Sequence, residues 1–269
     1  MPKRLIINSD DYGRSPDISR GIREAHLNGV VTSTTCMINI QTTARDIAIA
    51  LNEAPTLKMG VHLVLTAKRP ILPLQWTKSI TDENGDFLKY DAFIANLPHL
   101  DILEVKAEWR AQVEAYIAAA ASKPTHLDSH HHSSYFSPAL FQAMLELAKE
   151  YECPIRFPLA PSETSREFAE TSKHAFALLK EFNPKRPDHF IVTFYDEGAT
   201  LENLLNILNN LPEGTSELMC HPGHVDQAFA EKESVYNFQR EREVSILTDS
   251  AVKQVIEANG IELITFADL

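Results

Sequence analysis

The amino-acid sequence predicts an α/β fold: a (β/α) barrel of seven or eight parallel strands, regular or distorted, whose active site lies at the carboxyl ends of the strands. Short apolar runs alternate with helical patterns along all 269 residues. Parallel strands require such crossovers, which are usually helices, and about eight strand–helix units fit this length. The runner-up is an open doubly wound sheet, but no glycine-rich phosphate loop follows the first strand, where a dinucleotide-binding fold would carry one.

The expected strands share β-branched and large apolar residues and are bounded by turn residues. They lie at residues 5–8, 31–37, 59–65, 125–129, 154–157, 189–194, 217–220 and 261–265.

The helices between the strands are expected from apolar residues three and four positions apart. This spacing predicts helices over residues 102–120 and 140–151. A first helix is expected to start at Ser15-Pro16, because serine is a favoured N-cap and proline a favoured first helical residue. A last helix is expected to open at Thr248 or Asp249 and to end at Gly260.

The composition is that of one globular domain, residues 1–269, with 44% apolar and 23% charged residues and no linker that would divide it. No apolar run approaches the roughly 20 residues of a membrane span, and the N-terminus becomes polar too soon for a signal peptide. The net charge of −12 disfavours nucleic acid and anionic membranes as partners. Three widely spaced cysteines fit a reducing compartment, so a cytoplasmic location is expected. A homodimer is one assembly that the sequence allows.

Polar side chains with metal-binding and proton-transfer chemistry follow several predicted strands. Asp10-Asp11 follow the first strand, Asn39 the second, the run 126–132 the fourth and His221 the seventh, while His62 lies in the third. The carboxyl ends of barrel strands meet at one face. Most of the 11 histidines of the chain fall at three of these ends: His62, His126, His130, His131, His132, His221 and His224.

Each of these features has a structural alternative. Asp10-Asp11 fit a turn or a helix cap, His62 fits a core histidine bonded to a carbonyl, and the histidine run fits a solvated loop. His221-Pro222-Gly223 fit a rigid turn. Trp76 and Trp109 are expected in the core or in a substrate-binding wall. The functional interpretation rests on the features occurring together.

One aspartate and two histidines from separate strands make a three-ligand metal site with positions left for water or substrate. Asp11 is the expected anionic ligand. Asp10 is then free to act as a base, because a nearby dication favours ionised carboxylates.

Within the run 126–132, strand alternation places His126, Asp128 and His130 on one face. His130 is nearest the strand end and is the predicted ligand, with His126 or His132 as the alternatives. Asp128 is expected to orient an imidazole. His131 points to the opposite face and is the least favoured ligand.

Five ordered segments resemble the motif blocks of the YdjC-like carbohydrate deacetylases, whose best-characterised members are chitooligosaccharide deacetylases. They are Asn-Ser-Asp-Asp-Tyr-Gly (8–13), Gly-Val-Val-Thr-Ser-Thr (29–34), Gly-Val-His-Leu (60–63), Thr-His-Leu-Asp-Ser-His-His-His (125–132) and Met-Cys-His-Pro-Gly (219–223). The C-terminal helix and strand fit as well, so the resemblance covers essentially the whole chain.

The resemblance implies a metal-dependent N-deacetylase on a (β/α) barrel, acting on short N-acetylglucosamine oligosaccharides with or without a phosphate. It implies one divalent ion, Mg²⁺ or Zn²⁺, and it assigns the following roles: metal ligands Asp11, His62 and His130, base Asp10 and acid His221. Asn39, Asp128 and His132 are expected to bind substrate or to support the ligands. The chain departs from the family at Ser134, where a further histidine is common, and this affects the inferred substrate specificity.

Two other functions compete with this one. A phosphoesterase-like barrel hydrolase would share the ligands, but the acidic net charge and the lack of an Arg/Lys cluster at the strand ends disfavour a polyanionic substrate. A saccharide- or metal-binding protein without activity would not need both Asp10 and His221. The long stretch 66–87 is expected to form a mobile wall over the sugar.

Overall fold

A parallel sheet is the centre of the fold. The computed structural model describes residues 2–158, 169–225 and 236–269. In this part of the chain, seven strands form one sheet with the path β4-β3-β2-β1-β6-β5, and β7 pairs with β1. The strands are β1 (Lys3–Tyr12), β2 (Ser33–Cys36), β3 (Lys58–Leu63), β4 (Leu127–Ser129), β5 (His189–Ile191), β6 (Gly214–Cys220) and β7 (Glu262–Leu263). All of the pairings between these strands are parallel, as the sequence predicted.

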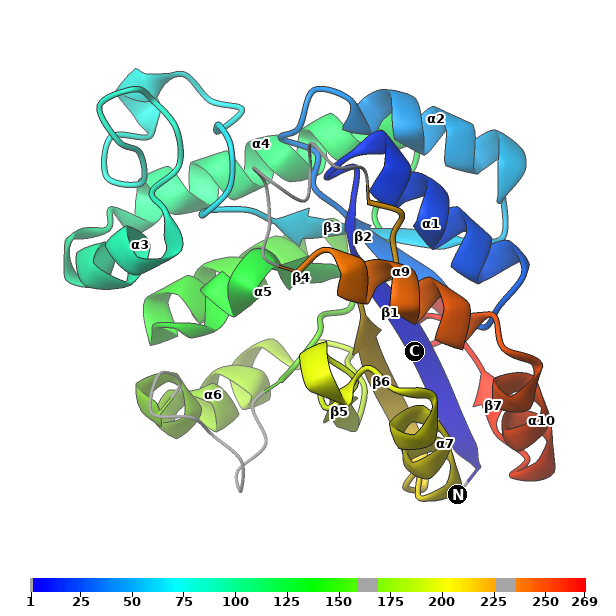
Figure 1. Ribbon diagram of the computed structural model, residues 1–269. Helices are drawn as coiled ribbons and strands as arrows, with labels where there is room; N and C mark the ends of the chain where they lie inside the picture. Colours follow the sequence, from blue (N-terminus) through cyan, green and yellow to red (C-terminus); the bar gives the residue numbers. More distant parts are fainter. Residues whose placement is uncertain (1, 159–168, 226–235) are drawn as a thin grey trace.

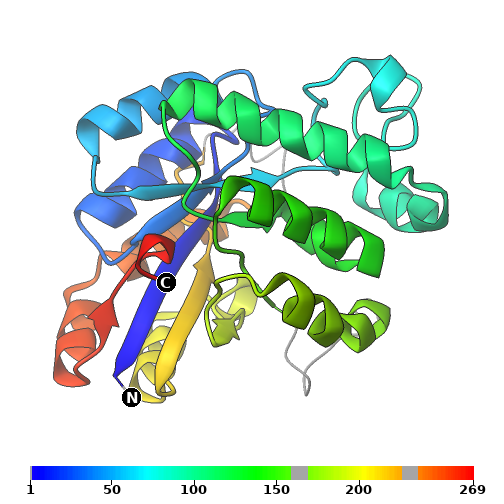
Figure 2. The same ribbon diagram turned by 180° about the vertical axis from the view of Figure 1, so that it is seen from behind.

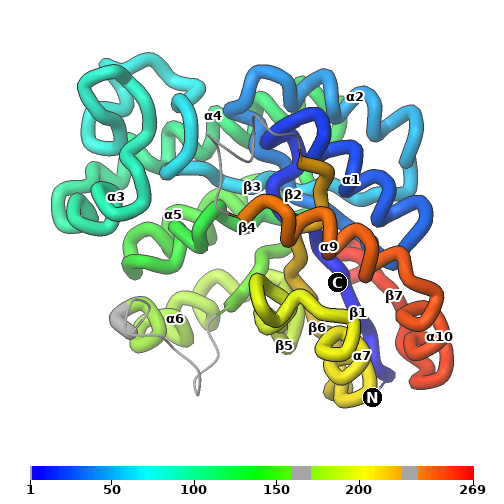
Figure 3. Tube along the Cα trace, in the orientation of Figure 1, coloured from blue at the N-terminus to red at the C-terminus, as the bar shows by residue number. Residues whose placement is uncertain are grey.

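The sheet forms a half-barrel. No strand pairing in the described ranges joins β4 to β5, so a closed barrel of seven or eight strands is not what the structure shows. The prediction of a regular strand at residues 154–157 is wrong, because only one bridge forms there, between Leu127 and Ile155. Pro154 and Pro158 flank this bridge, and proline has no amide hydrogen to extend a ladder. Figure 3 traces the open arrangement, with β2, β3 and β4 on one side of β1 and β6 and β5 on the other.

Helices cover the outside of the sheet (Figures 1 and 2). They are α1 (Pro16–Leu27), α2 (Thr43–Glu53), α3 (Tyr90–Asn96), α4 (Ile102–Ala120), α5 (Pro138–Tyr151), α6 (Ala169–Phe182), α7 (Leu201–Asn209), α9 (Phe238–Leu247) and α10 (Ser250–Ala258). Short 3₁₀ helices are η1 (Leu74–Trp76), η2 (Leu97–His99), η3 (His130–Tyr135), η5 (Asp196–Gly198) and η6 (Phe266–Asp268). None of the described helices is both long and apolar enough to cross a membrane.

The predicted helix boundaries have visible causes. Ser15 Oγ accepts a hydrogen bond from the amide of Ile18 and so caps α1. Asp249 caps α10 in the same way, through the amide of Ala251. The apolar spacing over residues 102–120 coincides with the observed bounds of α4, which places Trp109 in the core.

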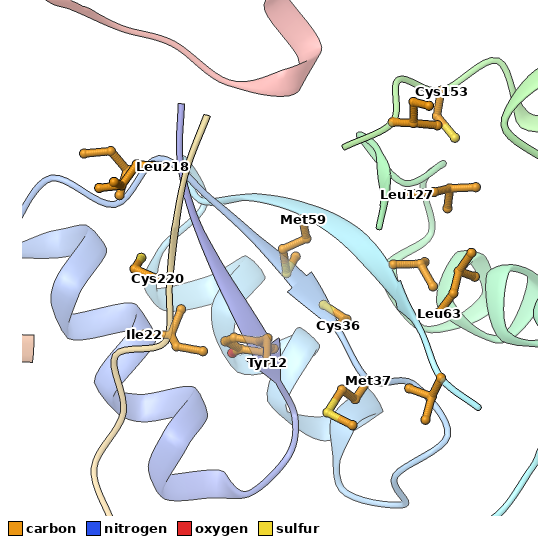
Figure 4. Packing of buried hydrophobic residues seen from close by; sticks show 14 of the residues in the cluster. Tyr12, Ile22, Cys36, Met37, Met59, Leu63, Leu127, Cys153, Leu218 and Cys220 are labelled. Atoms are coloured by element: carbon orange, nitrogen blue, oxygen red, sulfur yellow. The ribbon is translucent and has the colours of Figure 1, made fainter. Parts of the chain in front are cut away.

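The core lies between the sheet and its helices. Figure 4 shows Tyr12, Ile22 and Cys36 packed together from β1, α1 and β2. Burying one large apolar side chain contributes about 1.5–3 kcal/mol, so this layer holds the strand ends in fixed positions. All three cysteines are free thiols in the core, whereas Trp76 is exposed.

Candidate active site

A pocket opens at the carboxyl ends of the central strands. Its volume is ≈ 420 Å³, and its lining contains seven of the residues that the sequence singled out: Asp10, Asp11, His62, His130, His131, His132 and His221. Asp128 lies directly beneath it, bonded to His62. The parallel sheet therefore brings together residues of β1 and β3 with residues that follow β4 and β6, which are far apart in the chain.

A bulge in β1 turns both neighbouring aspartates toward this pocket. Successive residues of a regular strand point to opposite faces. Between the pairs Ser9↔Thr34 and Tyr12↔Cys36, however, β1 advances three residues while β2 advances two. Asp11 sits in this bulge with φ 72°, a conformation that non-glycine residues rarely adopt. The extra residue lets Asp10 and Asp11 face the same space.

The carboxylate of Asp11 meets two imidazoles. Its Oδ1 atom lies 3.6 Å from His62 Nε2 and 3.2 Å from His130 Nδ1. All three side chains are buried, and the ligand atoms they offer lie within 4.8 Å of one another. Within residues 2–158, 169–225 and 236–269, no group forms a hydrogen bond with Asp11 Oδ1. A buried carboxylate oxygen is costly without a partner, so the site has the geometry of a cation site.

The imidazole of His62 is held from behind by Asp128. Its Nδ1 atom donates to Asp128 Oδ1 at 2.6 Å, and Thr35 Oγ1 donates to the other oxygen of Asp128 at 3.0 Å. Burial lowers the pKa of His62, but the facing Asp128 outweighs it and raises the pKa above its usual value. The bond at Nδ1 leaves Nε2 directed at Asp11, which is the arrangement seen in carboxylate–histidine–metal sites.

The histidine run separates into different environments. His130 faces Asp11, and burial lowers its pKa to about 4, so its imidazole is neutral near pH 7. His131 contacts Thr66 Oγ1 at 3.0 Å, and His132 lines the pocket. His126 stacks on Phe266 with 3.7 Å between the ring centroids, away from the pocket.

Asp10 is fixed by an arginine that the sequence interpretation did not single out. Arg156 is fully buried and binds both oxygens of Asp10, at 2.7 and 2.6 Å. The same guanidinium lies 2.9 Å from Asp128 and donates to Glu217 at 2.7 Å. Burial raises the pKa of Asp10, but Arg156 outweighs it and holds that pKa well below its usual value. Burial raises the pKa of Glu217 to about 7 in spite of Arg156.

His221 lines the same pocket as the candidate cation site formed by Asp11, His62 and His130. Its Nε2 atom is 3.9 Å from Asp10 Oδ2, and its Nδ1 atom has no hydrogen-bond partner among the residues that the structure describes. Its backbone amide donates to Glu243 at 2.5 Å. Burial lowers the pKa of His221 to about 4, although Asp10 opposes the shift, so the imidazole is neutral near pH 7.

Two further arginines line the pocket, although the sequence indicated no cationic cluster at the strand ends. Arg240, on α9, donates to Asp11 Oδ2 at 2.6 Å, and Arg14 does so at 3.3 Å. Both therefore bind the oxygen of Asp11 that faces away from the imidazoles. Arg156 carried a detectable signal, as a charge inside a predicted apolar strand. Arg240 carried none, because it lies in a charged helical run that resembles a solvated face.

Three other sequence-based expectations concern residues outside this cluster. Asn39 donates to the carbonyls of Ala67 and Arg69, so it fixes the start of the stretch 66–87 and does not line the pocket. Residues 66–87 are likewise absent from the described lining, where Tyr90 stands instead. Ser134 is buried, with its Oγ 2.7 Å from that of Ser129.

Comparison with known proteins identifies the family. The family model described as YdjC-like protein matches residues 4–258. The chain belongs to the YdjC-like family. The resemblance inferred from the five motif blocks is thus confirmed.

Named members of the family match along their whole length. A carbohydrate deacetylase of Clostridium beijerinckii is 37% identical over 270 residues, which cover 99% of this chain and 100% of that protein. A chitooligosaccharide deacetylase of Yersinia pestis is 32% identical, with 100% of both chains covered. A crystal structure of an Enterococcus faecalis protein, with a proposed role in cellobiose-phosphate cleavage, matches with a TM-score of 0.89 at 35% identity, covering 100% of this chain and 99% of that one.

Proposed function

We propose that this YdjC-like protein is a metal-dependent hydrolase that removes N-acetyl groups from short N-acetylglucosamine oligosaccharides. The observation that carries the proposal is the buried Oδ1 of Asp11, which has no hydrogen-bond partner in the described part of the chain and is faced by His62 and His130. One carboxylate oxygen and two imidazole nitrogens fit a divalent cation such as Zn²⁺ or Mg²⁺. The substrate class is taken from the relatives named carbohydrate deacetylase and chitooligosaccharide deacetylase.

Asp11, His62 and His130 would hold the ion. When bound there, a divalent cation polarises an acetyl carbonyl as a Lewis acid and makes water more acidic. The protein's own groups supply the rest of the chemistry. Arg240 and Arg14 donate hydrogen bonds to Asp11 Oδ2, which leaves Oδ1 as the oxygen that would bind the ion. Asp128 fixes the ring of His62 so that its Nε2 atom faces the same point.

Asp10 is placed to accept the proton of the attacking water. Arg156 keeps this carboxylate ionised and in one orientation. A carboxylate with a lowered pKa is a weak base, so Asp10 relies on its position close to the attacking water.

His221 is placed to protonate the departing nitrogen. Its lowered pKa makes it neutral in the resting protein, so it must receive a proton before it can donate one. Asp10 Oδ2 lies 3.9 Å from its Nε2 atom, and a small side-chain movement would bring the two into hydrogen-bond range. We therefore propose that the proton taken from water passes through Asp10 to His221 and then to the amine.

Acetate release from diacetylchitobiose by the metal-loaded protein tests this function. Turnover that chelator abolishes and added divalent metal restores is expected, with little turnover of p-nitrophenyl phosphate beside it. An Asp11→Asn variant should lose both metal and turnover. Release of phosphate but not acetate would favour the phosphoesterase alternative and overturn the proposal.

A further inference from the structure

A second hollow adjoins the pocket on the side of His221. Its volume is ≈ 640 Å³, and its lining is Asp196, Glu197, Asn237, Phe238, Gln239 and Arg242. The residues that precede two of these in the chain, Tyr195 and Tyr236, line the catalytic pocket itself. The two hollows therefore share a wall made by consecutive residues.

That wall is aromatic. Tyr195 and Tyr236 stack with 4.5 Å between their ring centroids and 7° between their planes. Both rings also make T-shaped contacts with the imidazole of His221, with 5.4 and 5.6 Å between the ring centroids. Beyond them, Phe238 is 70% exposed and Tyr195 is 42% exposed. Aromatic side chains thus line both the pocket beside the candidate acid and the second hollow.

The polar groups of this hollow are held in place. Gln239 Nε2 donates to Asp196 Oδ1 at 3.1 Å, and Arg242 Nη2 donates to the carbonyl of Asp196 at 2.6 Å. The amide of Asp196 donates to Tyr236 Oη at 3.3 Å. These three bonds hold Asp196 at φ 52°, a left-handed conformation that is unusual for aspartate. The site is therefore built before any ligand arrives.

We infer that this second hollow binds the sugar units next to the one that is deacetylated. The inference rests on the proposed function. Pyranose rings present an apolar face that packs on aromatic side chains, and their hydroxyls bond to fixed carboxylate, amide and guanidinium groups. Two carboxylates and one guanidinium line the hollow, so it suits neutral or amino-sugar units and disfavours a phosphate at this end of the substrate.

The test compares kcat/KM for the tetramer and the dimer of N-acetylglucosamine, measured with the metal-loaded protein. In wild type the tetramer should be the better substrate. Phe238→Ala should lower the tetramer-to-dimer ratio about tenfold, the size expected when an aromatic contact is removed. Phe176→Ala is the matched control, because Phe176 is also exposed but lies on α6 and does not line the hollow. Its ratio should equal that of wild type.

A second measurement separates the sugar-binding hollow from the deacetylase function. It is the affinity of the chelator-treated protein for the tetramer, measured by calorimetry. Phe238→Ala should weaken this binding by a similar factor, and Gln239→Ala should weaken it too by releasing Asp196. Binding that Phe238→Ala weakens, without acetate release by the metal-loaded protein, overturns the deacetylase and keeps the binding site. Deacetylation with a tetramer-to-dimer ratio and an affinity unchanged in both variants overturns the binding site and keeps the deacetylase.

Discussion

Replacing Arg156 with methionine should expose how much the buried charges beneath the pocket depend on one guanidinium. Arg156 is fully buried and contacts Asp10, Asp128 and Glu217 at 2.6–2.9 Å. Methionine has a similar length without the charge, so Arg156→Met removes the cation and leaves little empty volume. Removing one partner of a buried ion pair costs about 3–5 kcal/mol, because the remaining charge stays buried without compensation. A folded domain is stable by only about 5–15 kcal/mol. The variant should therefore be strongly destabilised but still folded in the absence of urea.

The loss should depend on pH in a defined direction. In wild type the pKa of Asp10 is held well below its usual value, so the stability this group contributes is fully present above about pH 4 and is lost only at lower pH. In Arg156→Met, burial raises the pKa of Asp10 against only the smaller opposing effects of His62 and His221, and folded variant molecules take up protons as the pH falls. Glu217 acts in the same direction. In wild type, burial raises the pKa of Glu217 to about 7 although Arg156 lowers it, so this pKa should rise further in Arg156→Met. The difference in stability between wild type and variant should therefore shrink between about pH 7.5 and pH 5.

Urea unfolding followed by circular dichroism, with chelator present in every sample, measures this difference. Arg110→Met is the matched control, since Arg110 pairs with Glu150 through side chains that are 39% and 43% exposed. An exposed pair contributes at most about 1 kcal/mol, so the control should change little at either pH. Arg156→Met losing no more stability than the control, or losing the same amount at both pH values, would refute the reasoning.

Other outcomes follow from the site. His130→Ala should lose its metal by elemental analysis, while His224→Ala, a histidine outside the pocket lining, should keep it; full metal in His130→Ala would move the ligand role to His132, because His126 lies away from the pocket. His221→Ala should lower kcat/KM for the amide by at least about 10²-fold and spare an activated ester, which needs no protonated leaving group; equal losses on both substrates would exclude the acid role. Metal affinity measured by titration should fall as the pH drops through the raised pKa of His62, because a proton competes for Nε2; an affinity that does not change with pH would contradict His62 as a ligand.

The sequence was informative where local pattern decides structure. Apolar spacing located α4, and capping residues located the starts of α1 and α10. The order of strands and helices implied a parallel sheet whose ends collect the polar motif residues. Because the carboxyl ends of parallel strands share one face, Asp11, His62 and His130 could be predicted to meet without knowledge of any distance.

Other features depend on long-range packing that no local pattern records. Whether the sheet closes depends on one bridge at Ile155 and on the geometry between β4 and β5. The partner of Arg240 lies 229 residues away, at Asp11. The shared orientation of Asp10 and Asp11 comes from a bulge, which a pattern of alternating residues predicts incorrectly.

The bulge also explains how two adjacent aspartates can have different roles. Both are buried acids facing one pocket. If the same surroundings served both, their negative charges would repel each other and the pKa of one carboxyl would rise. Instead, each is paired with a different cation. Arg156 binds both oxygens of Asp10, so this carboxylate stays ionised with a fixed orientation and faces His221. Arg240 and Arg14 bind only Oδ2 of Asp11, so its Oδ1 remains directed at the imidazoles. The division between base and metal ligand thus arises from which oxygens the arginines occupy, and it holds only while the bulge keeps both carboxylates on the same face.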